Sequence, residues 1–230
     1  MAQDGEIQIS GIVVPEDENV LLNLNFDPSA PMPLIDESTS TTATLDIVST
    51  AGNALSGGGA LHLAGGDAAN WTAVKGSVKV TPNPDWKRIR FSGRVRTPDA
   101  DNKWEKITFE FRYYDGANYT DFQLVKNSNA GLDLNWKYLD SGGSLSVLTA
   151  LNSVWYGNSD VWQTIELDLD LESMAYERIK VGDIVIQNLV ANQGVDTRSP
   201  QVYVAFSLSP IGGMGTSHVY LNNLLIRGLK

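Results

Sequence analysis

The segment from residue 161 to residue 189 constrains the fold more than any other part of the chain. Its first half alternates apolar and polar side chains without interruption. The apolar positions are Ile165, Leu167, Leu169 and Leu171, and the polar positions are Thr164, Glu166, Asp168 and Asp170. A period of two predicts a β-strand with one buried face. A second run at residues 175–181 and the turn dipeptide Gly182-Asp183 predict that the chain returns and turns again, as in an antiparallel sheet.

The rest of the chain repeats this pattern in roughly a dozen short runs separated by turn residues. The clearest hairpin region spans residues 88–124, with strands expected at 88–96 and 104–114 and a turn favoured by the dipeptide Asp115-Gly116 before the returning strand. The side chains expected on the polar face of this hairpin are Glu110, Arg112, Tyr114, Tyr119, Asp121 and Gln123. No segment keeps a helical period over three turns, and residues 191–200 are expected to form a loop.

These patterns predict an all-β fold, an antiparallel two-sheet β-sandwich whose facing sheets bury the apolar positions. We expect a short N-terminal arm at residues 1–19 and a single sandwich domain at residues 20–230, since no boundary signal follows residue 20. The tryptophans expected to fill or cap the core are Trp71, Trp86, Trp104, Trp136 and Trp162.

The composition excludes several kinds of chemistry and partner. The chain has no cysteine, which excludes disulfides, thiolate metal sites and cysteine nucleophiles. Its net charge of -10 argues against a nucleic-acid backbone or an anionic membrane as the main partner. No apolar run approaches the length of a membrane span, so we expect no membrane insertion.

Four short segments carry a resemblance to a known superfamily. Residues 162–167 (WQTIEL) and 180–186 (KVGDIVI) resemble the strand, hairpin and turn near the end of jelly-roll carbohydrate-binding domains, the concanavalin A-like lectins and glucanases. Residues 219–226 (VYLNNLLI) resemble their closing strand, but with Asn222-Asn223 where those modules carry Asp-Asp or Asp-Asn. Residues 24–27 (LNFD) resemble their first strand. The resemblance implies a jelly-roll sandwich, a glycan partner and an extracellular or cell-surface location, with no signal peptide in this chain.

Three functions fit this fold. The leading hypothesis is a non-catalytic, lectin-like module that binds a polysaccharide or glycan. The first alternative is a glycoside hydrolase or polysaccharide lyase that uses carboxylates such as Glu166 or Glu110, and the second is a structural or adhesive surface domain.

We favour a non-catalytic domain because the acidic residues do not match a catalytic spacing. One glycosidase family on this fold uses Glu-x-Asp-x-x-Glu, whereas this chain follows Glu166 and Asp168 with Asp170 and Glu172. The alternative is that these acids form a solvated strand face and pair with basic side chains on a neighbouring strand. Those basic residues are Arg88, Arg90, Arg94 and Arg96.

The candidate ligand site combines aromatic rings with hydrogen-bonding groups, because sugars present both apolar faces and hydroxyls. Trp155 and Tyr156 lie in a polar loop at residues 152–160, where a role in the core is less compelling, although Trp155 could also pack beneath that loop. The predicted ligand-binding residues are Trp155, Tyr156, Tyr114, Tyr119, Arg112 and Glu110.

Metal binding is the last candidate. The two histidines, His62 and His218, are far apart and lack ligand spacing, so a zinc site is not expected. The resemblance implies a structural calcium ion, held by carboxylates and backbone carbonyls. Asp27, Asp160 and Asp183 lie in suitable loops but form no cluster in the sequence.

Overall fold

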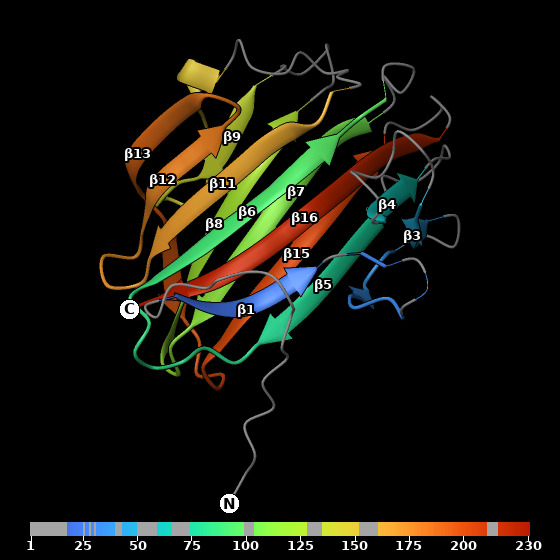
Figure 1. Ribbon diagram of the computed structural model, residues 1–230. Helices are drawn as coiled ribbons and strands as arrows, with labels where there is room; N and C mark the ends of the chain where they lie inside the picture. The colour runs from blue at the N-terminus through green and yellow to red at the C-terminus, as the bar shows by residue number, and fades with distance from the viewer. Residues whose placement is uncertain are drawn as a thin grey trace, which may run out of the picture.

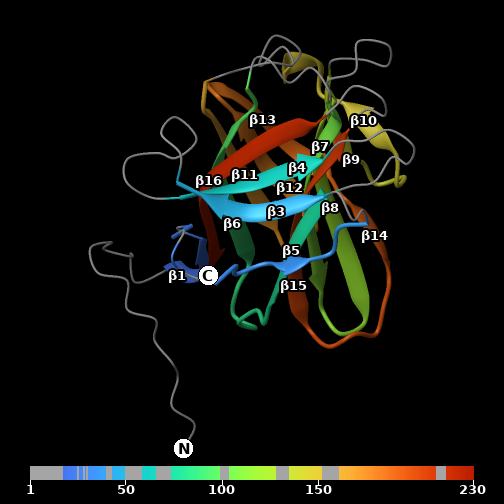
Figure 2. The same cartoon turned by 90° about the vertical axis from the view of Figure 1, so that its right-hand side faces the viewer.

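Two antiparallel sheets lie face to face, which confirms the predicted sandwich (Figures 1 and 2). The computed structural model describes residues 18–24, 26–27, 29, 31–39, 43–49, 59–65, 74–98, 104–127, 135–151, 161–210 and 216–230. Sheet A, the front layer in Figure 1, has the order β13 (Ile184–Val190), β12 (Ala175–Val181), β11 (Gln163–Asp170), β6 (Arg88–Arg96), β16 (Ser217–Leu229), β4 (Ala60–Gly65) and β3 (Thr44–Val48), and β1 (Glu18–Leu24) also pairs with β16.

Sheet B forms the second layer. Its order is β10 (Leu145–Val147), β9 (Trp136–Leu139), β8 (Asn118–Asn127), β7 (Trp104–Tyr114), β15 (Gln201–Pro210), β5 (Val74–Val80) and β2 (Ile35–Asp36), and β14 (Asn192–Val195) also pairs with β8. The other regular element is a 3₁₀ turn at Thr149–Leu151. Within the described ranges, no helix has the length and apolar character that crossing a membrane requires.

Phe91 on β6 shows how the two sheets meet. Its ring is buried, with its centroid 4.9 Å from that of Phe111 on β7 and 5.9 Å from that of Phe206 on β15. Because β6 belongs to sheet A whereas β7 and β15 belong to sheet B, these contacts cross the interior. Alternation along each strand then turns its other side chains outward, so polar sites form on the outer faces of the sheets.

β11, β12 and β13 form the strand–turn–strand–turn–strand unit that the sequence predicts. Gly182 in the second turn has a φ of 58°, in the left-handed region that glycine adopts without strain. β11 also pairs with β6, and the two registers place Asp168 between Arg90 and Arg178 on the outer face of sheet A.

Asn222 gives a structural reason for one departure from the superfamily pattern. Its side chain is 3% exposed, and its Nδ2 donates a hydrogen bond to the backbone carbonyl of Gly59 at 2.8 Å. An ionised aspartate has no donor for that carbonyl, so asparagine suits this position better. The next residue, Asn223, has a φ of 50° where the pairing of β16 with β6 shifts register.

The structure also corrects and limits some expectations. The predicted loop at residues 191–200 contains β14, so that prediction was wrong for residues 192–195. Trp86 and Trp136 are buried as expected, and Trp162 is half-buried. Of the other two tryptophans, Trp71 and the side chain of Trp104 lie outside the described part of the chain. The predicted N-terminal arm also falls outside it, apart from the first residues of β1, and stays a prediction.

Candidate functional site

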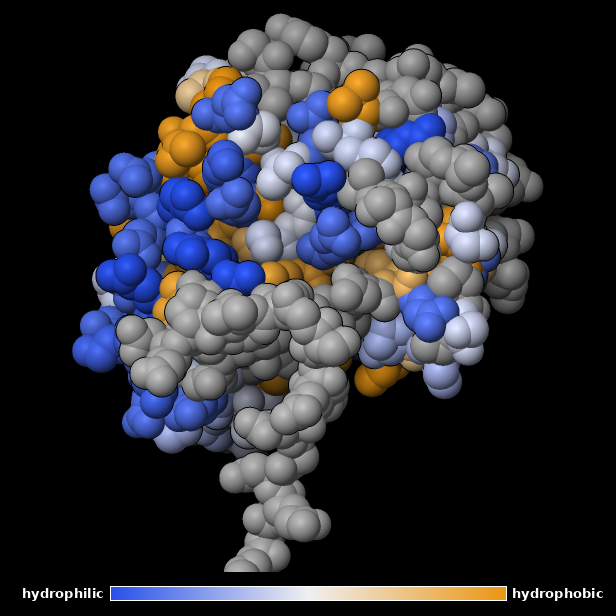
Figure 3. All heavy atoms as spheres, viewed as in Figure 1, coloured by the Kyte–Doolittle hydropathy of each residue, from blue (hydrophilic) through white to orange (hydrophobic). Residues whose placement is uncertain are grey.

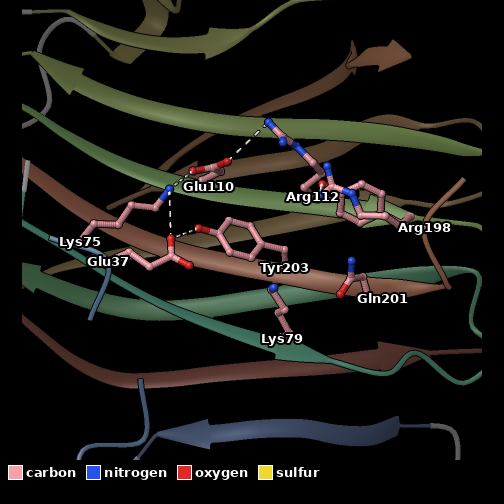
Figure 4. A pocket seen from close by; sticks show the side chains of 9 residues that line it. Glu37, Lys75, Lys79, Glu110, Arg112, Arg198, Gln201 and Tyr203 are labelled. Carbon is pink, nitrogen blue, oxygen red and sulfur yellow. Dashed lines mark hydrogen bonds and ion pairs between the residues drawn. The ribbon is translucent and has the colours of Figure 1, made fainter. Parts of the chain in front are cut away.

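A polar pocket of about 260 Å³ lies on the outer face of sheet B (Figure 4). Strand pairing places Lys79 on β5 opposite Tyr203 on β15, and Tyr203 opposite Arg112 on β7. The residues that line the pocket are Glu37, Lys75, Lys79, Glu110, Arg112, Tyr114, Arg198, Gln201 and Tyr203. Three of the predicted site residues, Glu110, Arg112 and Tyr114, are among them. The period of two along β7 therefore gathers these three side chains on one wall.

Two small side chains lie on the outer face of sheet B among the residues that line the pocket. Ala205 on β15 lies between Ser77 on β5 and Glu110 on β7 in the sheet register. Ser77 and Ala205 are almost completely buried, although both point away from the sandwich core. Lys75, Glu110 and Tyr203, which are neighbours of this pair on the same face, line the pocket.

Lys75 links the two carboxylates of the pocket at one end. Its Nζ lies 3.1 Å from Glu110 Oε2 and 3.7 Å from Glu37 Oε2, while the Tyr203 hydroxyl donates to Glu37 Oε2 at 2.7 Å (Figure 4). Burial would raise the pKa of Glu37, but the hydrogen bond from Tyr203 and the nearby lysines lower that pKa overall.

The same contacts set the protonation of Lys75 and Tyr203. Burial would lower the pKa of Lys75, but Tyr203 and Glu110 outweigh it and raise that pKa. Burial raises the pKa of Tyr203 as well, and its hydrogen bond to Glu37 adds to that rise. At neutral pH the pocket therefore holds an ionised Glu37, a charged Lys75 and a neutral Tyr203.

Two arginines lie over tyrosine rings at the other end of the pocket. Arg112 ion-pairs with the buried Asp121 on β8 and lies 5.3 Å from the centroid of the Tyr119 ring. Arg198 donates to the Tyr114 hydroxyl at 3.1 Å and lies 4.8 Å from that ring's centroid. Burial would lower the pKa of Arg112, but its hydrogen bond to Asp121 outweighs burial and raises it.

The aromatic residues predicted for the site lie in different places. Tyr114 is only 2% exposed because Arg198 covers it, so it contributes a wall rather than an open ring. Tyr119 lies next to the pocket, with its ring centroid 6.3 Å from that of Tyr114. Trp155 and Tyr156 fall outside the described residues, and their role stays a prediction.

Sequence reasoning missed most of the pocket. Lys75 and Lys79 come from β5, Gln201 and Tyr203 come from β15, and Arg198 precedes β15. The alternation along residues 201–209 already turns Tyr203 away from the core. The missing information was that β15 lies between β5 and β7, which depends on contacts far apart in sequence.

The acidic residues of β11 form ion pairs on the outer face of sheet A, the hydrophilic area over β11 and β12 in Figure 3. Asp168 accepts hydrogen bonds from Arg90 Nε at 2.6 Å and Arg178 Nε at 2.9 Å. Glu166 binds Arg178 at 2.7 Å and Lys180 at 3.1 Å. The pairing alternative holds for Arg90 on β6, whereas Arg178 and Lys180, which also pair with these acids, lie on β12. Asp168 is also buried beneath its partners rather than solvated.

The two histidines meet on the same outer face, although the sequence suggested no connection between them. His62 Nε2 lies 2.9 Å from His218 Nδ1, and His62 Nδ1 lies 2.8 Å from Asp46 Oδ1. Both nitrogens of His62 are thus engaged in a chain of hydrogen bonds that joins β3, β4 and β16.

No group of three or more His, Asp or Glu side chains is arranged to hold a metal within the part of the chain that the structure describes. Asp27 accepts hydrogen bonds from Ser29, and Asp183 lies exposed in the turn between β12 and β13. Asp160, the third residue considered for calcium, falls outside the described residues.

The fold is an antiparallel two-sheet β-sandwich of jelly-roll type, as the sequence predicts. The chain is similar to the carbohydrate recognition domain of Emp47p, with 15% identity, 91% of this chain and 94% of that chain covered, and a TM-score of 0.50. Weaker similarity extends to alginate lyase vAL-1 from Chlorella virus, with 11% identity, coverages of 81% and 90%, and a TM-score of 0.47. It extends also to TmCBM61 in complex with β-1,4-galactotriose, with 11% identity, coverages of 87% and 89%, and a TM-score of 0.37.

These similarities concern the fold alone, because the identities are low. Comparison of the sequence with known protein families finds no match, and comparison with curated proteins finds none either. Function must therefore be argued from the site itself.

Proposed function

We propose that this protein is a non-catalytic glycan-binding domain whose ligand occupies the pocket between β5, β15 and β7. The observation that carries the proposal is the cluster of Tyr203, Lys75, Glu37 and Glu110, in which hydrogen bonds and ion pairs hold each polar group in place. Fixed donors and acceptors around an aromatic ring suit the hydroxyls and apolar faces of a sugar. The carbohydrate-binding type of fold supports the same conclusion.

The protonation of the pocket argues against a glycosidase. A glycosidase needs one carboxylic acid that stays protonated, with a raised pKa, to donate a proton to the leaving oxygen. The carboxylates that line this pocket are Glu37 and Glu110, and both bind Lys75. The pKa of Glu37 is lowered, which is the opposite of what a general acid requires.

The test is a panel of soluble polysaccharides, read for retention in affinity gels and for release of reducing ends or unsaturated products. We expect retention without product. Tyr203→Ala should weaken binding about 10-fold or more, which corresponds to about 1.4 kcal/mol. Gln201→Ala should weaken it less, because it removes only hydrogen bonds. The matched control is Gln187→Ala on β13, which lies exposed on sheet A and should leave binding unchanged.

Two results would contradict this proposal. Product formation would identify an enzyme on this fold. Loss of binding in Trp155→Ala or Tyr156→Ala, with Tyr203→Ala unaffected, would keep glycan binding but move the site to the loop at residues 152–160. Thermal unfolding of each variant shows that a change in retention is not a change in folding.

Affinity should be nearly independent of pH between about pH 5.5 and 9. Because the pKa of Glu37 is lowered, that carboxylate is ionised at every pH above the ordinary pKa of glutamate, about 4.3. Because the pKa values of Lys75 and Tyr203 are raised, both groups stay protonated below about pH 10. Binding should weaken only as the pH falls below about 4, where Glu37 takes up a proton. Calorimetric titration at several pH values checks this, and a step near pH 6.5 would contradict it.

Three further proposals concern the domain organisation, the location and a structural calcium ion. We infer a single domain over residues 20–230, because β1 near its start pairs directly with β16 at its end. An extracellular or cell-surface location stays a prediction from the resemblance. A structural calcium ion stays a prediction from the resemblance. Repeating the binding panel in calcium and in EDTA tests it, because a required ion would make retention sensitive to the chelator.

A further inference from the structure

The pocket differs in charge from the rest of the molecule. Its lining contains four cationic side chains, Lys75, Lys79, Arg112 and Arg198, and two carboxylates, Glu37 and Glu110. The whole chain carries a net charge of -10. The side chains that line the pocket therefore carry two more positive than negative charges, although Asp121 and Asp196 beside the pocket offset its two arginines. An exposed cation in this lining favours an anionic group locally.

The excess positive charge lies at one end of the pocket. At the other end Lys75 faces two carboxylates, so that end carries no excess of positive charge. Arg112 is paired with Asp121, and Arg198 with Asp196. Lys79 is exposed and forms no ion pair with any residue that the structure describes, although its charge acts on Glu37 at longer range. Because both arginines are paired, Lys79 carries the positive charge that is most available to a ligand.

The sheet register places these groups within reach of one ligand. Lys79 and Arg112 lie on either side of Tyr203, and because neighbouring strands are about 4.8 Å apart, their backbones are about 10 Å apart. Gln201 lies two residues from Tyr203 on the same face of β15 and opposite Tyr114, which Arg198 covers. An anionic group above Gln201 would thus have cationic side chains from both neighbouring sides (Figure 4).

The net charge of the chain does not cancel this local attraction. At physiological ionic strength the screening length is about 8 Å, so acidic groups on distant faces act weakly on a ligand in the pocket. Contacts within hydrogen-bonding distance are screened much less. A short anionic segment in the pocket is therefore favoured, although long-range steering of a polyanion is not.

Building on the proposed function, we propose that the glycan carries a carboxylate or a sulfate group, and that Lys79, Gln201 and Arg198 bind this group. The two anions share the chemistry that these residues recognise, which is an oxygen anion that accepts several hydrogen bonds. Arg112 and Tyr203 border the same end and contact the adjoining sugar ring.

The experiment compares matched polysaccharides. The probes are polygalacturonic acid and alginic acid, each beside its carboxyl-reduced form, and dextran sulfate beside dextran. We expect the charged member of a pair to bind about 10-fold or more tightly than its neutral counterpart, and binding to weaken as salt is raised. Binding of the uronic acid polymers alone assigns the carboxylate, and binding of dextran sulfate alone assigns the sulfate.

Two variants locate the anion. Lys79→Gln and Arg198→Gln should each weaken binding of the charged member about 5-fold, with little effect on a neutral polysaccharide. Lys106→Gln on β7 removes the same charge from the same sheet outside the pocket lining, and it should have no effect.

The outcomes separate this inference from the proposed function. If neutral polysaccharides bind as well as charged ones and Tyr203→Ala still weakens binding, the pocket binds glycans but the anion is not recognised, which overturns the inference alone. If no polysaccharide of the wider panel is retained, both proposals fail. Equal losses in Lys79→Gln and Lys106→Gln would also overturn it, because the effect would then follow total charge.

Discussion

Replacing Asp168 with alanine is expected to lower the free energy of unfolding by about 2–3 kcal/mol. The side chain of Asp168 is 8% exposed and accepts hydrogen bonds from Arg90 and Arg178, which join three neighbouring strands. Without it, Arg90 and Arg178 each lose this carboxylate as an acceptor, although Arg178 keeps its ion pair with Glu166. The loss in stability stays below that of a fully buried pair because the side chains of Arg90 and Arg178 are still 34% and 27% exposed. Urea unfolding at neutral pH measures the change.

Glu172→Gln is the matched control for that prediction. Glu172 lies just beyond β11 and pairs with Lys87, but both side chains are mostly exposed, at 64% and 59%. Such exposed pairs contribute little to stability, so no measurable change is expected. Equal effects of the two substitutions would show that Asp168 is no more important than a surface charge. Loss of polysaccharide binding in Asp168→Ala at a temperature where it is folded would instead revive a functional role for the acids of β11.

Gly228→Ala is expected to destabilise the fold by about 3 kcal/mol. A Cβ atom at residue 228 would overlap Cε2, Cδ2 and Nε1 of the Trp86 ring, well inside van der Waals contact. Trp86 is 9% exposed and belongs to the core cluster, so its ring has little room to move. The residue also lies between Ile89 on β6 and Asn19 on β1, which limits a backbone shift. The midpoint of thermal unfolding should fall by several degrees.

A double variant distinguishes this steric cause from a general effect of replacing glycine. Trp86→Phe shortens the ring system, so the pair Trp86→Phe with Gly228→Ala should be more stable than the sum of the two single effects predicts. Additive losses would mean that the ring and the new methyl group do not collide. Gly142→Ala in the exposed turn between β9 and β10 should cost much less than Gly228→Ala.

The alternation of side chains explains why the architecture was predictable. Ile165, Leu167 and Leu169 are buried because a strand at a sandwich interface has one apolar face, a local property that the order of residues records. The same rule assigned Glu110 and Arg112 to the outer face of β7, and both line the pocket. The alternation also placed Tyr114 on the outer face. It could not indicate that Arg198, 84 residues later in the chain, covers the Tyr114 ring.

The pocket itself depends on which strands become neighbours. The Tyr203 hydroxyl donates a hydrogen bond to Glu37, 166 residues away in the chain, and Lys75 Nζ lies over the Tyr203 ring. Neither contact leaves a local pattern in the sequence. The pairing of His62 with His218, 156 residues apart, escaped notice for the same reason. β14 was missed because Asn192–Val195 is a short strand without alternating hydrophobicity.

The sequence by itself therefore determined the strands, their buried faces, the sandwich and the outward set on β7, because these follow from side-chain periodicity within one strand. Only the tertiary structure decided that β15 lies between β5 and β7, that Lys75 joins two carboxylates, and that the acids of β11 bind arginines. Such contacts form between strands that are distant in the chain, and their order in a sheet is selected by packing of the whole core rather than by any local run of residues.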